Sequence, residues 1–347
     1  MIPDDQLQRL RKELETAEKP LFFFDDDPDG LCSFLLLYRI MNRGKGVVIK
    51  STPQLSDEFF RKVEEFMPDK VFILDKPMIS QKMLDLIHNV NIKTVWLDHH
   101  PVQQRELVDY YNPRIEDPQD NRPTAYWAYK IAQKDLWIAM VGMLGDWFMP
   151  EFREEFSKQY PDLLPENIVK AQDALFTTRV GLLARIFSFN LKGATTEVNR
   201  SIKILTRIED PYEILDQKTP RGKLIYKHYE KLYTVYAGLV ESVKVNDENI
   251  ILFTYKDNKM SFTSDMSNEL LYRHPDKIIF LAREKAGEMK CSIRASHITI
   301  PPILKEALQG VSGYGGGHDH ACGACIKKRD FQEFLKRFRE LVEKPMQ

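Results

Sequence analysis

The chain has 347 residues, of which 43% are hydrophobic and 29% are charged, and its formal net charge is -1. This length allows two domains, each with its own core. A nearly neutral chain does not coat nucleic acid or membrane by bulk charge, so an anionic ligand must be held by local clusters or by metal. Residues 1–19 lack the apolar core of a signal peptide, no later run is apolar enough to span a bilayer, and the four cysteines do not make a disulfide framework. We therefore expect a cytoplasmic protein that makes no membrane contact.

An apolar run at residues 22–24 predicts a buried strand, and a helical pattern follows at residues 31–40. Between them lie four acids within five positions and a glycine, namely Asp25, Asp26, Asp27, Asp29 and Gly30. Asp25, Asp27 and Asp29 recur with a period of two, so their carboxylates could converge from one side of an extended turn. Such crowded like charges favour a bound cation. Taken alone, the turn would favour a solvated loop with Asp29 capping the next helix, and the rest of the chain reverses that preference.

Short β-rich runs then alternate with helical patterns up to residue 97. This alternation predicts an α/β fold with a parallel sheet and helices on both faces. The predicted strands are 47–49, 71–74 and 94–97, and the predicted helices are 56–66 and 80–89. Ligands of such sheets bind at the carboxyl ends of the strands. Acids end three of the strands and should lie on one edge: Asp25, Asp75 and Asp98, the last followed by His99 and His100.

The remaining patterns divide the chain in two. Helices are predicted at 123–130 and 136–144, and a helical stretch at 150–230 has breaks at 190–193 and 210–211. A smaller α/β domain should start near Tyr233, with strands at 250–255, 278–282 and 290–295, a helix at 302–309, a glycine-rich loop and a basic final helix at 330–344. We predict a first domain at residues 1–230, including a helical connector at about 150–230, and a second domain at residues 231–347.

The acids and histidines at the predicted strand ends suggest a metal centre. Adjacent His99 and His100, flanked by Asp98, offer a ligand nitrogen, a second ring and a carboxylate that orients one of them. Together with the acids of the first two strand ends, they suit Mn or Mg better than a thiolate zinc site. Two metals that share a bridging carboxylate are the expected arrangement. Such a pair can activate water and clamp both oxygens of an in-line displacement at phosphorus.

At these residues the chain resembles the DHH phosphoesterase superfamily. The RecJ-like motif D-x-D-x-D-G is matched at residues 25–30, and a G-G-G-H-x-x-A-x-G signature, similar to that of the associated DHHA1 domain, is matched at residues 315–323. The motifs between them are matched, in order, by Asp75, by Asp98-His99-His100 and by Asp146 after Gly145. Many relatives carry a histidine early in the first motif, where this chain has Phe24 and Asp25. That difference favours the RecJ-like pattern over the pyrophosphatase pattern. The chain lacks room for the extra nucleic-acid-binding domains of bacterial RecJ, and in this it is similar to the compact archaeal RecJ-like proteins.

The resemblance implies a role for each matched residue. Asp27 would ligate one metal and Asp29 the other, while Asp75 would bridge them. His99 and Asp146 would complete the coordination of the second metal, and Asp25 would ligate or orient at the first. The expected ions are two divalent metals, with Mn preferred and Mg possible. Catalytic roles fall to Asp98, which would orient a histidine, and to His100, which would touch the scissile phosphate or the leaving group. Substrate phosphate would be held by Arg294, His318 and the backbone N–H groups of Gly315, Gly316 and Gly317.

Other interpretations of these residues remain open. His318, His320, Cys322 and Cys325, with Cys291 as a distant partner, could form a structural zinc site. Tyr126, Trp127 and Trp147 could stack bases, although aromatics at this spacing are commonly core residues. Arg294 could be a surface arginine and His100 a polar residue at a strand end.

The resemblance implies metal-dependent phosphoryl transfer to water. We expect an exonuclease on single strands of DNA or RNA, with 3′-to-5′ polarity by family analogy. One alternative is a phosphodiesterase of nano-oligonucleotides or cyclic dinucleotides. Another is a non-catalytic assembly module for an archaeal replication or repair helicase, which could also be a partner of the active enzyme.

Overall fold

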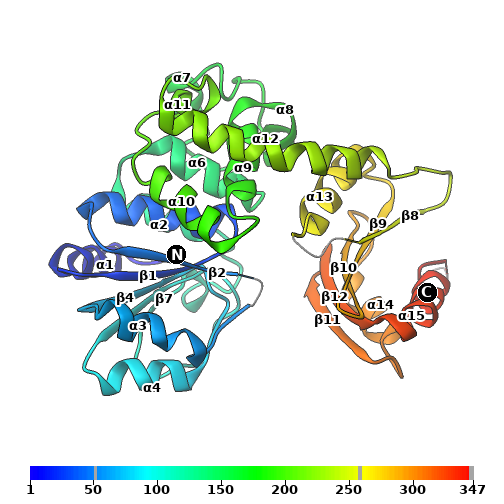
Figure 1. Ribbon diagram of the computed structural model, residues 1–347, viewed down its shortest axis with the longest axis horizontal. Coiled ribbons are helices and arrows are strands. Elements are labelled where there is room, and N and C mark those ends of the chain that lie inside the picture. The colour runs from blue at the N-terminus through cyan, green and yellow to red at the C-terminus, as the bar shows by residue number, and fades with distance from the viewer. Residues whose placement is uncertain (51–52, 257–259, 344–347) are drawn as a thin grey trace. The chain divides into compact units, whose positions relative to one another are not determined.

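The computed structural model describes residues 1–50, 53–256 and 260–343 (Figure 1). The chain forms two compact units. The first comprises Met1–Leu191 and Thr195–Tyr229, and the second comprises Lys192–Ala194 and Glu230–Gln347. Among the described helices, none is both long and apolar enough to cross a lipid bilayer.

The first unit is built on a parallel sheet, as predicted. Its strands lie in the order β2 (Lys45–Ile49), β1 (Leu21–Asp25), β4 (Lys70–Leu74), β6 (Lys93–Leu97) and β7 (Asp109–Tyr111). The register aligns Phe24 with Leu74 and Leu74 with Leu97, so the three acidic strand ends lie side by side at one edge, which confirms that expectation. The short strand β7 was not predicted. It pairs with β6, where the rings of Trp96 and Tyr110 stack with centroids 3.9 Å apart.

Helices cover both faces of this sheet (Figure 1). Alternate residues of β1 point to opposite faces. Phe22 and Phe24 pack on Phe34 of α2 (Pro28–Met41), whereas Phe23 belongs to a cluster with residues of α3 (Phe60–Phe66) and α4 (Gln81–Asn89). Burial on both faces explains why the strands read as continuous apolar runs. The unit also contains α1 (Asp4–Thr16), the short pair β3 (Gln54–Leu55) and β5 (Met78–Ile79), and the 3₁₀ turns η1 (Asp57–Phe59) and η2 (Pro113–Ile115).

A helical layer completes the first unit. Its members are α5 (Thr124–Ala132), α6 (Leu136–Gly145), α7 (Arg153–Gln159), α8 (Ala171–Thr177), α9 (Arg179–Asn190), α10 (Thr195–Leu205), α11 (Pro211–Leu215) and the first part of α12 (Pro220–Glu241), whose residues from Glu230 on belong to the second unit. The predicted helices and both predicted breaks are confirmed. The helix α12 runs through Tyr233, where the second domain was expected to start, because its apolar positions continue without a breaking residue.

The second unit has a smaller mixed sheet. Its strands lie in the order β11 (Gly313–His318), β12 (Ala321–Lys327), β10 (Glu288–Arg294), β9 (Ile278–Lys285) and β8 (Ile250–Lys256). Only the β8–β9 pair of this sheet is parallel in the described chain. The helices are α13 (Thr263–Arg273), which was not predicted, α14 (Ile300–Ala307) and α15 (Phe331–Glu343), preceded by the turn η3 (Lys328–Asp330). Phe280 of β9 packs on Phe331, Phe334 and Phe338 of α15. Lys344, the predicted end of the last helix, lies outside the described residues.

The glycine-rich segment is a strand, so its prediction as a loop was wrong. Residues 313–318 form β11, which pairs antiparallel with β12 at the edge of the sheet. A side chain would not fit at two of its glycines. A Cβ atom on Gly317 would lie 2.3 Å from the Ala321 carbonyl oxygen, and one on Gly315 would lie 2.9 Å from that of Gly323. The glycines therefore allow close strand pairing rather than marking a turn.

Gly142 provides a test of how tightly the helical layer packs on α2. A Cβ atom at this position of α6 would lie 2.6 Å from the Cβ of Ala125 and 2.7 Å from that of Cys32. We expect Gly142→Ala to lower the free energy of unfolding by about 1–3 kcal/mol, because α2, α5 and α6 must move apart. Gly238→Ala is the matched control, since Gly238 lies within α12 and a Cβ there meets nothing within 4 Å. Urea unfolding should show no loss for the control, and an equally stable Gly142→Ala protein would contradict the prediction.

Candidate metal centre

The acidic turn is shorter than its sequence spacing predicted. β1 ends at Asp25, and α2 already begins at Pro28, so Asp29 lies in the first helical turn. Asp27 is the N-cap, and its carboxylate accepts a hydrogen bond of 2.9 Å from the Gly30 amide. Proline suits the first helical position and aspartate suits the cap. The expectation of one extended turn with period-two carboxylates was therefore wrong, although the acids remain close together.

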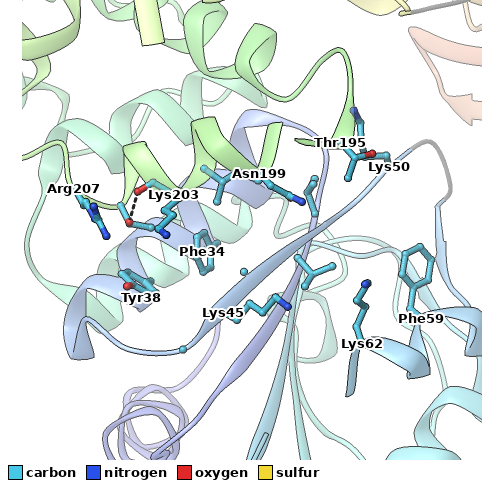
Figure 2. A pocket seen from close by; sticks show the side chains of 16 residues that line it. Phe34, Tyr38, Lys45, Lys50, Phe59, Lys62, Thr195, Asn199, Lys203 and Arg207 are labelled. Carbon is cyan, nitrogen blue, oxygen red and sulfur yellow. Dashed lines mark hydrogen bonds between the residues drawn. The ribbon is translucent and has the colours of Figure 1, made fainter. Parts of the chain in front are cut away.

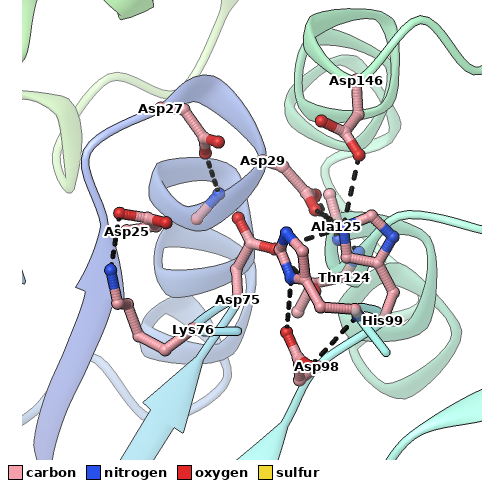
Figure 3. Close-up of polar contacts among 12 residues, drawn as sticks. Asp25, Asp27, Asp29, Asp75, Lys76, Asp98, His99, Thr124, Ala125 and Asp146 are labelled. Atoms are coloured by element: carbon pink, nitrogen blue, oxygen red, sulfur yellow. Dashed lines mark hydrogen bonds and ion pairs between the residues drawn. The ribbon is translucent and has the colours of Figure 1, made fainter. Parts of the chain in front are cut away.

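Asp29 is buried and is held by the start of another helix. Its two carboxylate oxygens accept hydrogen bonds from the backbone amides of Thr124, at 2.8 Å, and Ala125, at 2.6 Å (Figure 3). These amides belong to the first turn of α5, where backbone N–H groups have no partner within the helix. The helix N-terminus thus stabilises one negative charge of the site. Sequence reasoning did not identify Thr124, although a threonine at a predicted helix start was a signal.

Asp75 occupies the centre of the cluster. It follows β4 with a φ angle of +58°, a left-handed conformation that aspartate tolerates better than most residues. Its Oδ1 accepts a hydrogen bond of 3.1 Å from the Thr124 hydroxyl, whereas its buried Oδ2 has no hydrogen-bond partner among the described residues. A buried carboxylate oxygen without a partner is costly, so this atom is suited to a ligand that the protein alone does not provide.

His99 faces three of the acids (Figure 3). Its Nε2 atom lies 3.3 Å from Asp146, 3.5 Å from Asp75 and 3.9 Å from Asp29. Asp146 ends α6 and is the more exposed of these acids. Burial, followed by the charge of His100, lowers the pKa of His99 to about 4. The ring is therefore neutral at pH 7, which is the form that binds metal.

Asp98 and His100 form a pair beside these residues, with Nδ1 of His100 3.9 Å from Asp75 Oδ1. The fully buried Asp98 carboxylate lies 2.8 Å from Nδ1 of His100 and also accepts hydrogen bonds from the His100 amide, Asn112 and Tyr110. Although burial opposes protonation, the hydrogen bond with Asp98 raises the pKa of His100. This contact fixes Nδ1 as the protonated nitrogen and leaves Nε2 for another partner. The geometry thus places Asp98 where it orients His100.

Asp25 is the exception among the acids, because it is paired with a lysine. The Lys76 ammonium lies 2.9 Å from Asp25 Oδ1, and the Lys76 side chain is fully buried (Figure 3). Sequence reasoning did not single out Lys76, although a lysine directly after a strand-end aspartate was visible. The structure therefore gives Asp25 an internal counter-ion, whereas the family resemblance implies that it ligates or orients at the first metal.

Mutual repulsion and burial raise the pKa of the clustered carboxyl groups. Burial and then Asp27 raise the pKa of Asp25 to about 7, and burial and then Asp146 raise that of Asp27 to about 6. The pKa values of Asp29 and Asp75 also rise well above the usual range, first by burial and then by neighbouring carboxylates. Without a cation, the protein must protonate some of these groups or tolerate their repulsion.

The residues fit a divalent metal. Ligand atoms of Asp29, His99 and Asp146 converge within 4.8 Å, as do those of Asp75, His99 and His100. Carboxylate oxygens with one imidazole suit Mn or Mg. The partnerless Asp75 Oδ2 and the raised carboxyl pKa values support the same conclusion. Asp27 adjoins this group as a helix cap, and its role as a ligand stays a prediction.

The second unit aligns the predicted phosphate contacts on neighbouring strands. Ala321 of β12 pairs with Arg294 of β10 on one side and with His318 of β11 on the other. The Arg294 guanidinium hydrogen-bonds to Asn268 and to the backbone oxygens of Ile293 and Cys322, and burial lowers its pKa to about 10. Arg294 also lines a pocket of about 330 Å³, whose other lining residues include Arg283, Lys290 and Ser292. The predicted Gly315, Gly316 and Gly317 lie along the exposed edge strand.

The open alternatives receive little support. Cys322 and Cys325 lie three residues apart on β12, and no cluster of three metal-ligand atoms is found in the second unit within the part of the chain that the structure describes. Tyr126 and Trp127 are buried in the core and cannot stack with bases. Trp147 is half-buried and packs edge-on against Phe176.

Comparisons with known proteins agree with this geometry. The family model described as "DHH family, N-terminal domain" matches residues 21–164, and the model described as "DHHA1 domain" matches residues 247–344. Together these matches cover both the metal centre and the glycine-rich strand. No curated protein matches the chain.

Solved structures share the fold at low identity. RecJ from Thermus thermophilus in complex with Mn²⁺ is 16% identical with a TM-score of 0.71, and the match covers 99% of this chain and 56% of that protein. The chain thus spans little more than half of that RecJ. An exonuclease RecJ bound to manganese is 13% identical with a TM-score of 0.62, over 99% of this chain and 96% of that one. A DHH domain described as belonging to a family of ribosomal proteins is 16% identical with a TM-score of 0.66, over 100% of this chain and 94% of that one.

The raised carboxyl pKa values predict an unusual pH dependence for the metal-free protein. Asp27 has a pKa of about 6 in the folded protein, so it binds its proton more tightly there than in the unfolded chain. The free energy of unfolding that this proton contributes is therefore lost as the pH rises from about 4 to about 6. Asp27→Asn keeps an oxygen for the Gly30 cap but removes the charge. In EDTA at pH 7.5 this variant should be more stable than wild type by about 2 kcal/mol, and the difference should vanish near pH 4.

Urea unfolding at several pH values measures this difference. Asp109→Asn removes an exposed carboxylate as a control and should show no such trend. Adding Mn²⁺ should stabilise wild type more than Asp27→Asn at pH 7.5. If the wild-type protein were more stable than Asp27→Asn in EDTA at pH 7.5, the Asp27 carboxylate would not be destabilised by its burial and by the neighbouring carboxylates, and the prediction would be wrong.

The buried ion pair between Lys76 and Asp25 leads to a second prediction about stability. Lys76→Met would leave the Asp25 carboxylate without its ammonium partner in a largely buried site. We expect a loss of about 3 kcal/mol in the free energy of unfolding at pH 7.5 in EDTA. Lys82→Met is the matched control, since it removes an exposed lysine paired with Asp57 and should cost less than about 1 kcal/mol. If Lys76→Met and Lys82→Met lowered the free energy of unfolding equally, the buried Lys76–Asp25 pair would contribute no more to stability than an exposed pair.

Proposed function

Because the chain belongs to the DHH/DHHA1 phosphoesterase superfamily, we propose that it is a metal-dependent exonuclease that hydrolyses phosphodiester bonds in single strands of DNA or RNA. The observation that carries this proposal is the convergence of His99 with Asp29, Asp75 and Asp146, in a site where Asp75 Oδ2 has no hydrogen-bond partner in the described chain. RecJ proteins of the same fold have been solved with manganese, which supports a divalent ion here.

The carboxylates and one histidine would hold the metals. Asp29, His99 and Asp146 would bind one ion, Asp27 would contribute to the other, and Asp75 would bridge them. When bound, divalent ions at such a site activate water and neutralise charge on a phosphodiester. The backbone amides of α5 keep Asp29 in place, so the site is organised before substrate arrives.

His100 would act on the substrate rather than on a metal. Asp98 holds its Nδ1 proton and so turns Nε2 toward a different partner. A raised pKa keeps the ring able to donate from Nε2 to a phosphate oxygen or to the leaving oxygen. In the second unit, Arg294, His318 and the edge strand β11 would hold a substrate phosphate.

The substrate and the cellular role are further parts of the proposal. We assign 3′-to-5′ polarity and an archaeal RecJ-like branch by family analogy. A cytoplasmic enzyme that works with a replication or repair helicase fits this assignment. The same metal centre would also serve a phosphodiesterase of nano-oligonucleotides or cyclic dinucleotides, and a chain without activity would serve as an assembly module.

The cleavage pattern tests the proposal. Purified protein with Mn²⁺ should degrade single strands of DNA or RNA stepwise, and strands labelled at either end give the polarity. Asp75→Asn should lower the rate by more than about a hundredfold, since loss of a ligand should cost more than loss of an outer partner. Asp109→Asn, which alters an exposed carboxylate, should retain activity.

Other outcomes would assign the alternatives. Cleavage confined to dinucleotides would make the protein a phosphodiesterase of short substrates. Absence of Mn²⁺-dependent cleavage of every strand and dinucleotide would reject the enzymatic proposal in favour of the assembly module.

A further inference from the structure

A groove runs along the outer edge of β2 in the first unit (Figure 2). It has a volume of about 650 Å³ and is lined by residues 44–48 of this edge together with residues of α2, α3 and α10. In the described sheet β2 pairs only with β1, so its other edge is open toward the groove. We call this feature the β2 groove.

The β2 groove is strongly cationic. Its described lining residues include no carboxylate and five cations, namely Lys45, Lys50, Lys62, Lys203 and Arg207. Lys62 pairs with Glu65, which lies outside the lining. Lys45, Lys203 and Arg207 are exposed and form no ion pair with any residue in the described parts of the chain. Their positive charge attracts an anion.

Aromatic rings lie among these cations. Figure 2 shows Phe34, Tyr38 and Phe59 around the same hollow as the lysines. Phe34 is buried beneath the surface, with its ring centroid 5.5 Å from that of Tyr38, whereas Tyr38 and Phe59 are half-buried and present ring surface. Cations that hold phosphates, with aromatic rings for bases, are the usual means of binding single-stranded nucleic acid without sequence preference.

The groove leads to the edge of the sheet that carries the metal centre. β2 runs parallel to β1, with Val48 level with Phe24 and Ile49 level with Asp25. Lys50, which follows Ile49, therefore lies at the acidic end of the sheet, and Lys45 lies near the opposite end. Residues 44–48 alone extend over roughly 13 Å, a length suited to several units of an extended polymer.

We propose that the β2 groove binds the phosphates of a single strand beyond the scissile bond, so that one domain both cleaves the strand and holds its continuation. This proposal rests on the function proposed above and specifies its substrate as strands longer than a dinucleotide. A free nucleotide would use only part of the groove. An acidic peptide could use the cations and the open edge of β2, but it gains nothing from the half-buried rings or from continuity with the acidic edge.

The test is strand binding in EDTA, where no cleavage occurs. The groove variant combines Lys203→Glu with Arg207→Glu. The control variant combines Arg200→Glu with Lys223→Glu, which makes the same change in charge at exposed residues of α10 and α12 that do not line the groove. Fluorescence anisotropy would compare a labelled 12-nucleotide strand, a dinucleotide, AMP and a glutamate hexapeptide. A milder variant, Lys203→Gln with Arg207→Gln, and thermal unfolding of each protein check that folding is intact.

We expect the groove variant to bind the 12-nucleotide strand at least tenfold more weakly than the control variant does. The slope of log affinity against log salt should fall by about 1.4, as two lost phosphate contacts predict for a single strand. Dinucleotide binding should change much less. Equal strand binding by the two variants would overturn the proposal. The proposal would also be overturned if the groove variant lost AMP binding as strongly as it lost strand binding, which would indicate a nucleotide site. A loss of hexapeptide binding without a loss of strand binding would overturn it too and would indicate a protein partner. Because these readouts need no cleavage, they can fail or succeed independently of the exonuclease assay.

Discussion

The candidate metal centre of the first unit depends on several carboxylates that lie close together at one end of a parallel sheet. Parallel strands bring their carboxyl ends to one edge, so three strand-end aspartates become neighbours as a consequence of topology. Burial then makes their repulsion severe, as the raised carboxyl pKa values show. Such an arrangement is stable only where donors or cations offset the charge.

The protein offsets this charge in different ways at different acids. Asp29 receives two amide donors from α5, and Asp25 receives the buried ammonium of Lys76. Asp98 is satisfied by His100, Asn112 and Tyr110. Asp75, at the centre, keeps one buried oxygen without a partner. A ligand is therefore expected at the Asp75 oxygen that lacks a partner, whereas the carboxylates around it already have theirs.

The sequence predicted the parallel sheet and its acidic edge, because strand periodicity and strand ends are local signals. The convergence of His99 with Asp146 was implied only by the family resemblance, since Asp146 ends a helix. The sequence did not predict the role of Lys76 or Thr124, since each acts on an acid about 50 or more residues away. Gly315 and Gly317 were assigned to a loop, whereas they lie in strand β11. Pairing with the neighbouring strand β12 determines the conformation of this segment more than the local preference of glycine does.

The formal net charge of -1 conceals a separation of charge along β1 and β2. The acids gather beyond the carboxyl ends of the strands, while the cations of the β2 groove follow the outer edge of β2. A polyanionic strand would be repelled by the first region until metal neutralises it and attracted by the second at all times. Binding of the strand and its chemistry would then respond differently to metal: the groove needs none, whereas the acidic edge accepts a phosphate only after its own charge has been offset.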